Sequence, residues 1–417
     1  MDILRIATAG SIDDGKSTLI GRLLADTGSV PLDRLEAARL AGARRGLAGL
    51  DLSLLTDGLI AEREQGITID VAHVYFKTPL RKYIVADSPG HVEYTRNMIT
   101  GASTAAASIV LVDARAGLVE QTHRHCFIAA LLRIPTLIIA VNKMDLVGWQ
   151  QAPFDEVVTA VHRATSIARA GLPPPILVPV SALHGDNIVG RSSRMPWYSG
   201  PSLLEILDSA DPRPARSPLG RMQIQTPLRD PEGDRLYGGR IASGTFEVGD
   251  QVVVLPGEQR TTITRIDRLG TAVPAAHAGE SVSVGVSGFV DLSRGTMIAR
   301  PSEAPAGRSE IAARLCWMDD VALAPGKAYA LQHGPRVLRA RVTRIDGVID
   351  VETHRASPAP ALAMNDIGRV LIGTSQPLFA DDFAVNPSTG AFILIDEQTH
   401  RTVAAGFVEP GDSAGGA

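Results

Sequence analysis

The chain has 417 residues, of which 45% are hydrophobic and 21% charged, so at roughly 150 residues per domain it predicts about 2 to 4 folded domains. Its 41 Lys and Arg against 45 Asp and Glu give a net charge of −4, which excludes an overall attraction for nucleic acid or an anionic membrane, and no apolar run reaches the roughly 20 residues of a membrane helix. Two cysteines, Cys126 and Cys316, are too few for a disulfide framework or a four-cysteine zinc site, and we expect a reducing cytosol.

Residues 1 to about 210 alternate between short aliphatic runs and longer helical patterns. The aliphatic runs are 4–9, 83–87, 108–113, 136–141 and 176–180. Near-continuous aliphatic strands that alternate with helices are typical of a mostly parallel sheet covered on both faces. This part of the chain therefore predicts an α/β domain.

The first strand leads directly into a glycine-rich loop and then into a helical pattern. Residues 10–17 are GSIDDGKS, which matches the phosphate-loop motif G-x-x-x-x-G-K-S. In this motif backbone N–H groups cradle phosphates at a helix N-terminus, the lysine reaches the β- and γ-phosphates, and the serine hydroxyl binds Mg²⁺. We therefore expect a phosphate-loop domain whose nucleotide site, with Ser17 as a magnesium ligand, includes Gly10, Ser11, Asp13, Asp14, Gly15, Lys16, Ser17 and Thr18.

Asp87 ends the strand 83–87 and is followed by Ser, Pro and Gly90. It therefore emerges at the carboxyl edge of the sheet, where ligands bind in open α/β folds. An acid at this place can hold Mg²⁺ through water, and Gly90 can bring its N–H to a γ-phosphate. The structural alternative for this tetrapeptide is an ordinary Asx turn.

Two further polar loops follow strands at the same edge. The motif N-K-M-D after the strand 136–141 supplies Asn142, Lys143 and Asp145, and the tripeptide after the last strand is Ser181, Ala182 and Leu183. The Asp145 carboxylate can accept guanine N1–H and N2–H, a donor pair that adenine lacks, and Asn142 can meet the acceptor edge of the base. A backbone N–H of the tripeptide can reach guanine O6. Taken singly, these segments are also compatible with polar loops or helix caps.

Residues 211–218 contain three prolines in eight positions, which predicts a linker. Beyond it, short valine- and isoleucine-rich runs alternate with glycine, as in 239–255, and a second break follows at 300–307. This pattern is typical of small β-barrels or sandwiches. We expect a nucleotide domain at residues 1–211, β-barrel domains at 218–301 and 308–409, and a disordered tail at 410–417.

Together, the motifs G-x4-G-K-S, D-x-P-G, N-K-x-D and S-A-L resemble the GTPase branch of phosphate-loop proteins, and the β-domains are similar to those of the translation-factor-like superfamily. The resemblance implies GTP and Mg²⁺ as ligands. It identifies residues 63–68 as the first switch, in which Thr68 would complete the magnesium shell and contact the γ-phosphate. It also implies that His91 orients the attacking water, while Ile12 and Ile67 form an apolar gate around it.

Several stretches resemble, more narrowly, the GTPase subunit of bacterial sulfate adenylyltransferase. They are residues 13–17, 63–72, 90–98, 113–117, 195–201, 239–244 and 362–370. Ser88 stands where that family usually has threonine, a change that keeps the turn. Residues 34–55 form an alanine- and arginine-rich helical pattern, which we interpret as a solvated amphipathic helix. Cys126 lies near two histidines, but its helix fits the family pattern and we interpret it as core packing rather than as a metal ligand.

In the resembled enzyme, an ATP-using partner subunit makes adenosine 5′-phosphosulfate and pyrophosphate from ATP and sulfate, and GTP hydrolysis drives this uphill step. The resemblance implies a hetero-oligomer with that adenylyltransferase subunit. One phosphate loop is present, so we expect a stand-alone GTPase subunit without a fused adenylylsulfate kinase. Two alternatives stay open: a translation factor that carries aminoacyl-tRNA, which Asp14 and residues 94–98 oppose, and a paralogue with a different adenylylating partner in a specialised pathway.

Overall fold

The computed structural model describes residues 2–44, 52–55, 72–88, 95–166, 168–169, 171–212, 217–230 and 233–411. The chain divides into two compact units. The first comprises Met1–Ala215 with Val351–His354, and the second comprises Arg216–Asp350 with Arg355–Ala417. Within the described ranges, no helix combines the length and the apolar character that crossing a membrane requires.

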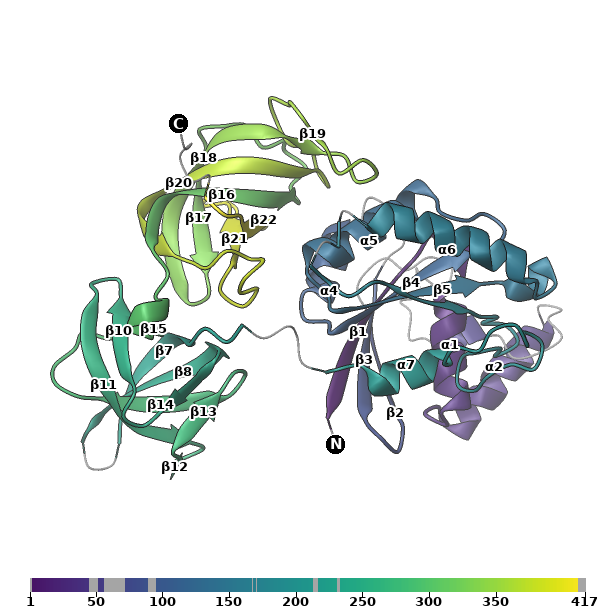
Figure 1. Ribbon diagram of the computed structural model, residues 1–417, viewed down its shortest axis with the longest axis horizontal. Coiled ribbons are helices and arrows are strands. Elements are labelled where there is room, and N and C mark those ends of the chain that lie inside the picture. Colours follow the sequence, from purple (N-terminus) through teal and green to yellow (C-terminus); the bar gives the residue numbers. More distant parts are fainter. Residues whose placement is uncertain are drawn as a thin grey trace. The chain divides into compact units, whose positions relative to one another are not determined.

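The first unit is built on a 6-stranded sheet with the order β2-β3-β1-β4-β5-β6 (Figure 1). Its strands are β1 Ile3–Ala9, β2 Ala72–Lys77, β3 Lys82–Asp87, β4 Ala107–Asp113, β5 Thr136–Asn142 and β6 Ile176–Pro179. Neighbouring strands are parallel except for β2 and β3. Every residue of β4 is buried, because helices cover both faces of the central strands.

Helices lie on both sides of this sheet (Figure 1). They are α1 Lys16–Asp26, α2 Leu32–Arg44, α4 Thr95–Ala102, α5 Glu120–Leu131, α6 Gln151–Thr165 and α7 Leu203–Ser209, with the short 3-10 helices η1 Ile12–Asp14, η2 Leu52–Leu55 and η4 Met144–Val147. Leu19 of α1 and Leu207 of α7 share a buried core with Leu4 and Ile6 of β1. Because β1, β3, β4, β5 and β6 are parallel, the loops that follow them gather at one edge.

The second unit contains two antiparallel sheets, each closed into a barrel. The first has the order β10-β15-β7-β8-β14-β11-β12, and β10 also pairs with β11. Its strands are β7 Arg221–Arg229, β8 Arg235–Ser243, β10 Gln251–Leu255, β11 Gln259–Arg268, β12 Thr271–Ala272, β14 Ser281–Val286 and β15 Met297–Ala299. Two short strands, β9 Thr245–Glu247 and β13 Ala275–His277, pair beside it. The pairing of β10 with β11 closes the barrel and removes the open edges that a flat sheet would expose.

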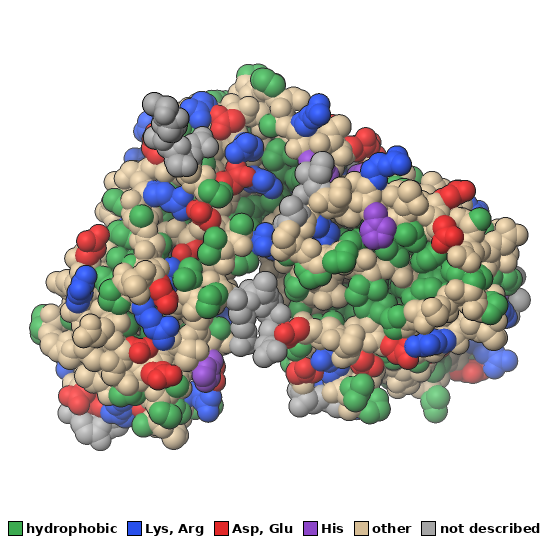
Figure 2. All heavy atoms as spheres, in the orientation of Figure 1, with side chains coloured by type: hydrophobic (Ala, Val, Ile, Leu, Met, Phe, Trp, Pro, Cys, Tyr) green, Lys and Arg blue, Asp and Glu red, His purple; other side chains and the backbone are tan. Residues whose placement is uncertain are grey.

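The second barrel follows a short 3-10 helix, η5 Pro301–Glu303, and has the order β17-β21-β22-β16-β20-β18-β19. Pairing of β17 with β18 closes it. Its strands are β16 Gly307–Trp317, β17 Ala328–His333, β18 Arg336–Ile349, β19 Ala356–Ser357, β20 Ile367–Phe379, β21 Ala391–Ile395 and β22 Thr402–Val408. Charged side chains of both signs are interspersed on the visible face of this unit (Figure 2).

A buried ion pair joins the two barrels. Arg221, at the start of β7, donates Nε and Nη2 to the two carboxylate oxygens of Asp381 at 3.0 and 2.8 Å. The side chains are 1% and 6% exposed. Oδ2 of Asp381 also accepts hydrogen bonds from Asn386 Nδ2 at 3.1 Å and Thr389 Oγ1 at 2.5 Å. Each charge therefore has a buried partner of opposite sign. The two-point contact also fixes one barrel against the other.

The expected architecture, an α/β phosphate-loop domain followed by two β-barrels, is confirmed. The edge strand β2 was not expected; its burial alternates and it runs antiparallel to β3. Within the helical pattern at 34–55, residues 34–44 lie in α2, whose described side chains are mostly exposed. Leu52 and Leu55 of η2 are instead buried in the core, against the expectation of a solvated helix. Residues 45–51 and 412–417 lie outside the described residues, and the domain bounds at 1–211, 218–301 and 308–409 stay predictions.

Candidate functional site

Two glycines give the phosphate loop its shape. Gly10 follows β1 and Gly15 precedes α1. Gly15 has a φ of 92°, a left-handed conformation that residues with a Cβ adopt only with strain. A Cβ on Gly15 would lie 2.6 Å from Nδ2 of Asn142, and one on Gly10 would lie 3.1 Å from Cβ of Leu111. Both positions of this glycine cradle therefore lack room for a side chain, because Asn142 and Leu111 approach them closely.

Lys16 begins α1, and its side chain folds back over the loop. Its Nζ donates to the main-chain oxygens of Gly10 at 2.8 Å and Ser11 at 3.3 Å. The residue is 5% exposed, and this burial lowers the pKa of Lys16, while nearby carboxylates, foremost Asp87, favour the charged ammonium. The first N–H groups of a helix have no helical acceptor. The ammonium and the N-terminus of α1, including Ser17 and Thr18, therefore converge on a place suited to an anion.

The two acids of the loop differ in their surroundings. Asp14 is 7% exposed, and its Oδ2 accepts the N–H of Ser11 at 2.6 Å. Asp13 is exposed. Burial raises the pKa of Asp14, although the Ser11 hydrogen bond and the charge of Lys16 oppose this change. Asp14 is thus part of the internal framework of the loop.

Asp87 ends β3 beside the phosphate loop. The parallel pairing of β1 with β3 sets Thr8 opposite Asp87, and Thr8 Oγ1 donates to Asp87 Oδ1 at 2.9 Å. Both residues are buried. The threonine hydroxyl therefore fixes the orientation of this carboxylate. The next residue, Ser88, is fully buried, and its Oγ has no hydrogen-bond partner within the described part of the chain.

Asn142 connects two loops of the site. Its Nδ2 donates to the main-chain oxygen of Asp14 at 2.7 Å, and its Oδ1 accepts the N–H of Ala182 at 2.9 Å. The residue is 2% exposed. The sequence predicted a contact between Asn142 and the base, which stays a prediction. The hydrogen bonds favour a positioning role in which Asn142 holds the phosphate loop and the S-A-L loop at a fixed separation.

Asp145 lies in η4, next to the S-A-L loop. Ser181 Oγ donates to Asp145 Oδ1 at 2.6 Å, and His184 Nε2 lies 4.0 Å from Oδ2. The Asp145 side chain is 11% exposed. One oxygen is therefore fixed by Ser181, while the carboxylate keeps access to a ligand at the sheet edge.

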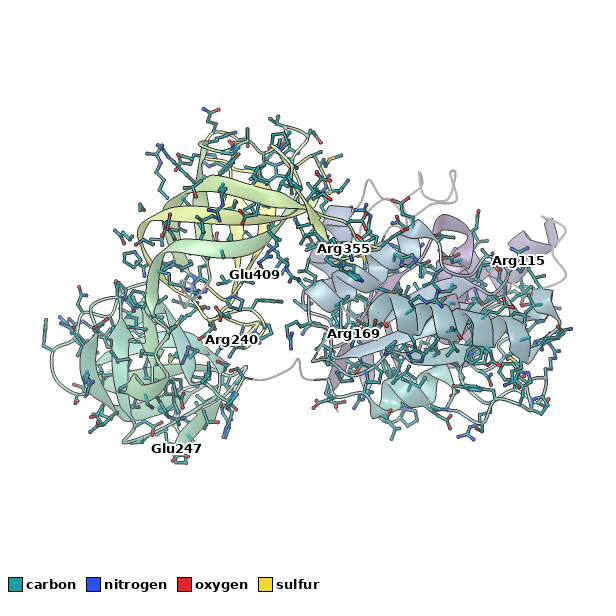
Figure 3. All side chains as sticks on the ribbon, turned by 45° about the horizontal axis from the view of Figure 1, so that its top comes forward. Arg115, Arg169, Arg240, Glu247, Arg355 and Glu409 are labelled. Carbon is teal, nitrogen blue, oxygen red and sulfur yellow. The ribbon has the colours of Figure 1, made fainter. Side chains whose placement is uncertain are left out.

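Lys143 is held on the other side of the same loop. It has a φ of 64°, and its Nζ donates to Asp113 Oδ2 at 2.9 Å. Arg115, labelled in Figure 3, donates Nη2 to the same oxygen at 2.7 Å. Burial alone would raise the pKa of Asp113, but the hydrogen bonds from Arg115 and Lys143 hold this pKa below its usual range. Lys143 is therefore anchored to the end of β4.

The S-A-L loop uses two of its own amides internally. Ser181 N–H donates to the main-chain oxygen of Asp186 at 3.3 Å, and Ala182 N–H donates to Asn142. Arg22 of α1 donates Nε to the oxygen of Ala182 at 3.2 Å and also bonds the oxygen of Leu183. The loop is thus fastened to both α1 and β5. The expected contact between one of its amides and guanine O6 stays a prediction.

Three residues with predicted roles at the γ-phosphate lie outside the described residues. They are Thr68, Gly90 and His91, together with the rest of the switch at 63–68. The side chain of Ile12 lies outside as well. Their roles in holding the γ-phosphate, Mg²⁺ and the attacking water stay predictions.

Sequence reasoning missed Thr8, Asp113 and Arg22. Asp113 could have been found by the rule that located Asp87, because it also ends a buried parallel strand at the ligand edge. Thr8 is set opposite Asp87 by strand register, and Arg22 reaches a loop 160 residues away. No local pattern signals either contact.

The two cysteines are free and buried. Cys126 lies in α5, and burial raises its pKa to about 12, which matches the core-packing interpretation. Among the residues that the structure describes, no group of three or more His, Cys, Asp or Glu side chains could hold a metal ion.

The residues at this edge fit a nucleoside triphosphate. The glycine cradle, the helix N-terminus and the buried ammonium of Lys16 suit phosphates, and the buried Oγ of Ser11 has no hydrogen-bond partner in the described ranges. The hydroxyl of Ser17 and the carboxylate of Asp87 are oxygen ligands of the kind that Mg²⁺ prefers. The fixed carboxylate of Asp145 suits a base with two adjacent N–H donors.

Two family models match the chain. Residues 1–213 match the elongation factor Tu GTP binding domain. Residues 310–409 match the GTP-eEF1A C-terminal domain-like family. The first match includes every loop described above, so the site is that of a GTP-binding domain.

Several curated proteins are similar over nearly the whole chain. The chain is 43% identical over 411 residues to "Sulfate adenylyltransferase subunit 1" of Saccharophagus degradans, covering 98% of this chain and 87% of that protein. It is 49% identical over 413 residues to "Bifunctional enzyme CysN/CysC" of Mycobacterium tuberculosis, covering 97% and 67%. It is 44% identical over 409 residues to "Bifunctional enzyme NodQ" of Rhizobium sp. (strain N33), covering 97% and 63%. The chain thus spans about two thirds of the length of the bifunctional relatives.

Proposed function

Because the chain belongs to the sulfate adenylyltransferase subunit 1 family and carries a GTP-binding domain of the elongation factor Tu type, we propose that it is the GTP-hydrolysing subunit of a sulfate adenylyltransferase. The partner, an ATP-using adenylyltransferase subunit, joins sulfate to the α-phosphate of ATP. This forms adenosine 5′-phosphosulfate and releases pyrophosphate. Water cleaves GTP on the present chain to GDP and phosphate.

The observation that carries this proposal is a set of hydrogen bonds that join the phosphate loop to the S-A-L loop and to Asp145. Asn142 bonds both Asp14 and Ala182, and Ser181 of the same loop bonds Asp145. A nucleotide that spans this framework presents its phosphates to Lys16 and its base to Asp145. Asp145 accepts guanine N1–H and N2–H, so the site takes GTP rather than ATP.

Hydrolysis at this site depends mainly on position and charge, as phosphoryl transfer generally does. Lys16 offsets charge on the phosphates, and the amides at the start of α1 bind their oxygens. Ser17 and Asp87 would hold Mg²⁺, which supplies positive charge beside the β- and γ-phosphates. Thr8 keeps the Asp87 carboxylate turned toward the loop. His91 is the residue that we predict to orient the water.

Coupling between the two reactions is conformational. Sulfate is a poor nucleophile and the phosphate–sulfate anhydride is high in energy, so the reaction of the partner is uphill by itself. A nucleotide can shift the equilibrium between two conformations of the complex only as far as its affinities for the two conformations differ. Contacts of Thr68 and Gly90 with the γ-phosphate would form in the GTP state and disappear on hydrolysis.

The test measures pyrophosphate release from ATP by the purified complex of this chain with its adenylyltransferase partner. We expect GTP to stimulate a sulfate-dependent release. The Lys16→Ala variant should keep the basal reaction of the partner and lose the stimulation. Release that is insensitive to GTP would refute the coupling, and GTP-dependent binding of aminoacyl-tRNA would support the translation-factor alternative instead.

A further inference from the structure

A single peptide bond of the phosphate loop is held between two opposite charges. The carbonyl of Gly10 accepts Nζ of Lys16 at 2.8 Å. The N–H of Ser11, which belongs to the same peptide group, donates to Oδ2 of Asp14 at 2.6 Å. Lys16 is 5% and Asp14 7% exposed. Solvent therefore screens neither charge as it would on the surface.

Asp14 is the inner of the two loop acids and acts on the charge that attracts phosphate. The positive groups that face it are Lys16 from α1 and Lys143 from the loop after β5, and the negative group is Asp113 at the end of β4. Its carboxylate favours the charged form of Lys16, as do those of Asp87 and Asp13. These carboxylates thus reduce the positive electrostatic potential that Lys16 presents to a phosphate.

The hydrogen bond to Ser11 does not by itself require a charge. A neutral amide oxygen accepts an N–H with the same geometry as a carboxylate oxygen. The negative charge of Asp14 therefore has a separate consequence, because Asp14 belongs to the loop that we assign to anionic phosphates and lies near its ammonium, Lys16. Like charges in a poorly screened site repel each other.

We propose that Asp14 is a counter-charge built into the phosphate loop, which weakens the hold of Lys16 on the nucleotide and so speeds the release of GDP. The inference rests on the proposed function, since it concerns the same nucleotide site. It identifies Asp14 as a positioning residue for the empty loop and as a determinant of nucleotide exchange. A subunit with such a loop exchanges GDP for GTP faster than the same loop without the charge.

The test is the dissociation rate of a fluorescent N-methylanthraniloyl GDP from the full chain, chased with unlabelled GDP. Asp14→Asn keeps an acceptor for Ser11 and removes the charge. We expect it to slow dissociation by about tenfold. Asp14→Ala removes both the charge and the acceptor, and it should give a smaller change. Asp13→Asn should also give a smaller change, because the charge of Asp13 is exposed.

Asp33→Asn is the control for net charge, because Asp33 is exposed on α2; it should leave the rate as in the wild type. If Asp14 only braces the loop, Asp14→Asn will dissociate at the wild-type rate or faster, and that result overturns the proposal. Failure of every protein, the wild type included, to bind the labelled GDP would instead overturn the proposed function.

A pH profile gives a second readout that a purely structural role would not produce. Because burial raises the pKa of Asp14, the wild-type carboxyl takes up a proton at a higher pH than an exposed aspartate. The wild-type dissociation rate should then fall toward that of Asp14→Asn as the solution is made more acidic. The gap between the two proteins should stay constant if the charge of Asp14 has no part in release.

Discussion

Asn142 donates Nδ2 to the main-chain oxygen of Asp14 at 2.7 Å, so the last residue of β5 holds the phosphate loop directly. Its Oδ1 accepts the N–H of Ala182 in the loop after β6. The residue, which ends β5, therefore joins two loops that are far apart in the sequence. The place that we assign to the base and the place that we assign to the phosphates are thus connected by hydrogen bonds of one side chain.

Asn142→Ala should lower the affinity for GDP and GTP by about tenfold to a hundredfold, since buried hydrogen bonds of this kind contribute about 1–3 kcal/mol when one partner is removed. The affinity is measured by isothermal titration calorimetry. Asn187→Ala is the matched control, because Asn187 is buried and bonds Pro179 at 2.9 Å and Ser192 at 2.8 Å without touching the phosphate loop. Equal affinity losses in both variants would contradict the role of Asn142 as the connecting residue.

Asp145→Asn should move the base preference from guanine to xanthine. Ser181 fixes Oδ1 of Asp145 at 2.6 Å, so the amide oxygen is expected there and the amide NH₂ at the place of Oδ2. That NH₂ can donate to the O2 of xanthine and cannot accept guanine N2–H. Competition between GDP and XDP should show a swing on the order of a hundredfold. An unchanged preference would show that Asp145 does not contact the base.

Gly15→Ala should impair both folding and nucleotide binding. At φ 92° an alanine is strained, and its Cβ would lie 2.6 Å from Nδ2 of Asn142. Gly28→Ala is the control, because Gly28 has a φ of 66° but open space around its Cβ position. Left-handed strain alone costs about 1–2 kcal/mol, and Gly15→Ala should exceed this in urea denaturation. A similar loss of unfolding free energy in both variants would mean that Asn142 moves aside to accommodate the added Cβ.

The sequence predicted the sheet, the barrels and the four loop motifs because each depends on local chemistry. Buried parallel strands need unbroken aliphatic runs, and a phosphate loop needs its glycines, as Gly15 shows. The expected place of Asp87 followed from the end of its strand alone. Each of these features requires particular residue types at adjacent positions, and such local patterns can be recognised in a single sequence.

The contacts that orient the site could not be predicted in this way. Thr8 reaches Asp87 only because strand register places them together, and Lys143 bonds Asp113 across two strands. The hydrogen bonds of the Asn142 amide with two loops were likewise not expected. Partner choice of this kind is set by tertiary packing. The edge strand β2 was missed for a related reason, since its half-exposed pattern is short.

Arg221→Met should destabilise the second unit by about 3–5 kcal/mol, because it leaves the buried carboxylate of Asp381 without its counter-charge. Arg369→Met is the control: Arg369 is 50% exposed and pairs with Glu409 at 3.0 Å, and such pairs contribute at most about 1 kcal/mol. Urea denaturation gives the loss, and hydrogen exchange of peptides from β7 and β22 assigns it to this unit. Comparable losses in the two variants would argue against the junction as a source of stability.

The stability of the first unit should fall with acidification because of His125. Burial, with the charges of Lys16 and Arg124, lowers the pKa of His125 from 6.5 to about 3. Gln121 Nε2 lies 3.2 Å from His125 Nε2, an arrangement that suits a neutral ring. Between pH 6.5 and about 3, His125 is protonated in the unfolded chain and neutral in the folded chain. The contribution is therefore fully present above pH 6.5 and is lost as the pH falls, by about 1.4 kcal/mol per pH unit.

Denaturant unfolding at pH 7.5, 6.0 and 5.0 measures this dependence. His125→Gln removes the titrating ring, so its free energy of unfolding should fall less steeply with acidification than that of the wild type, whatever its value at pH 7.5. His162→Gln is the control, because His162 is exposed on α6; it should keep the wild-type slope. Parallel slopes for all three proteins would mean that His125 is protonated in the folded state, against its burial beside Lys16.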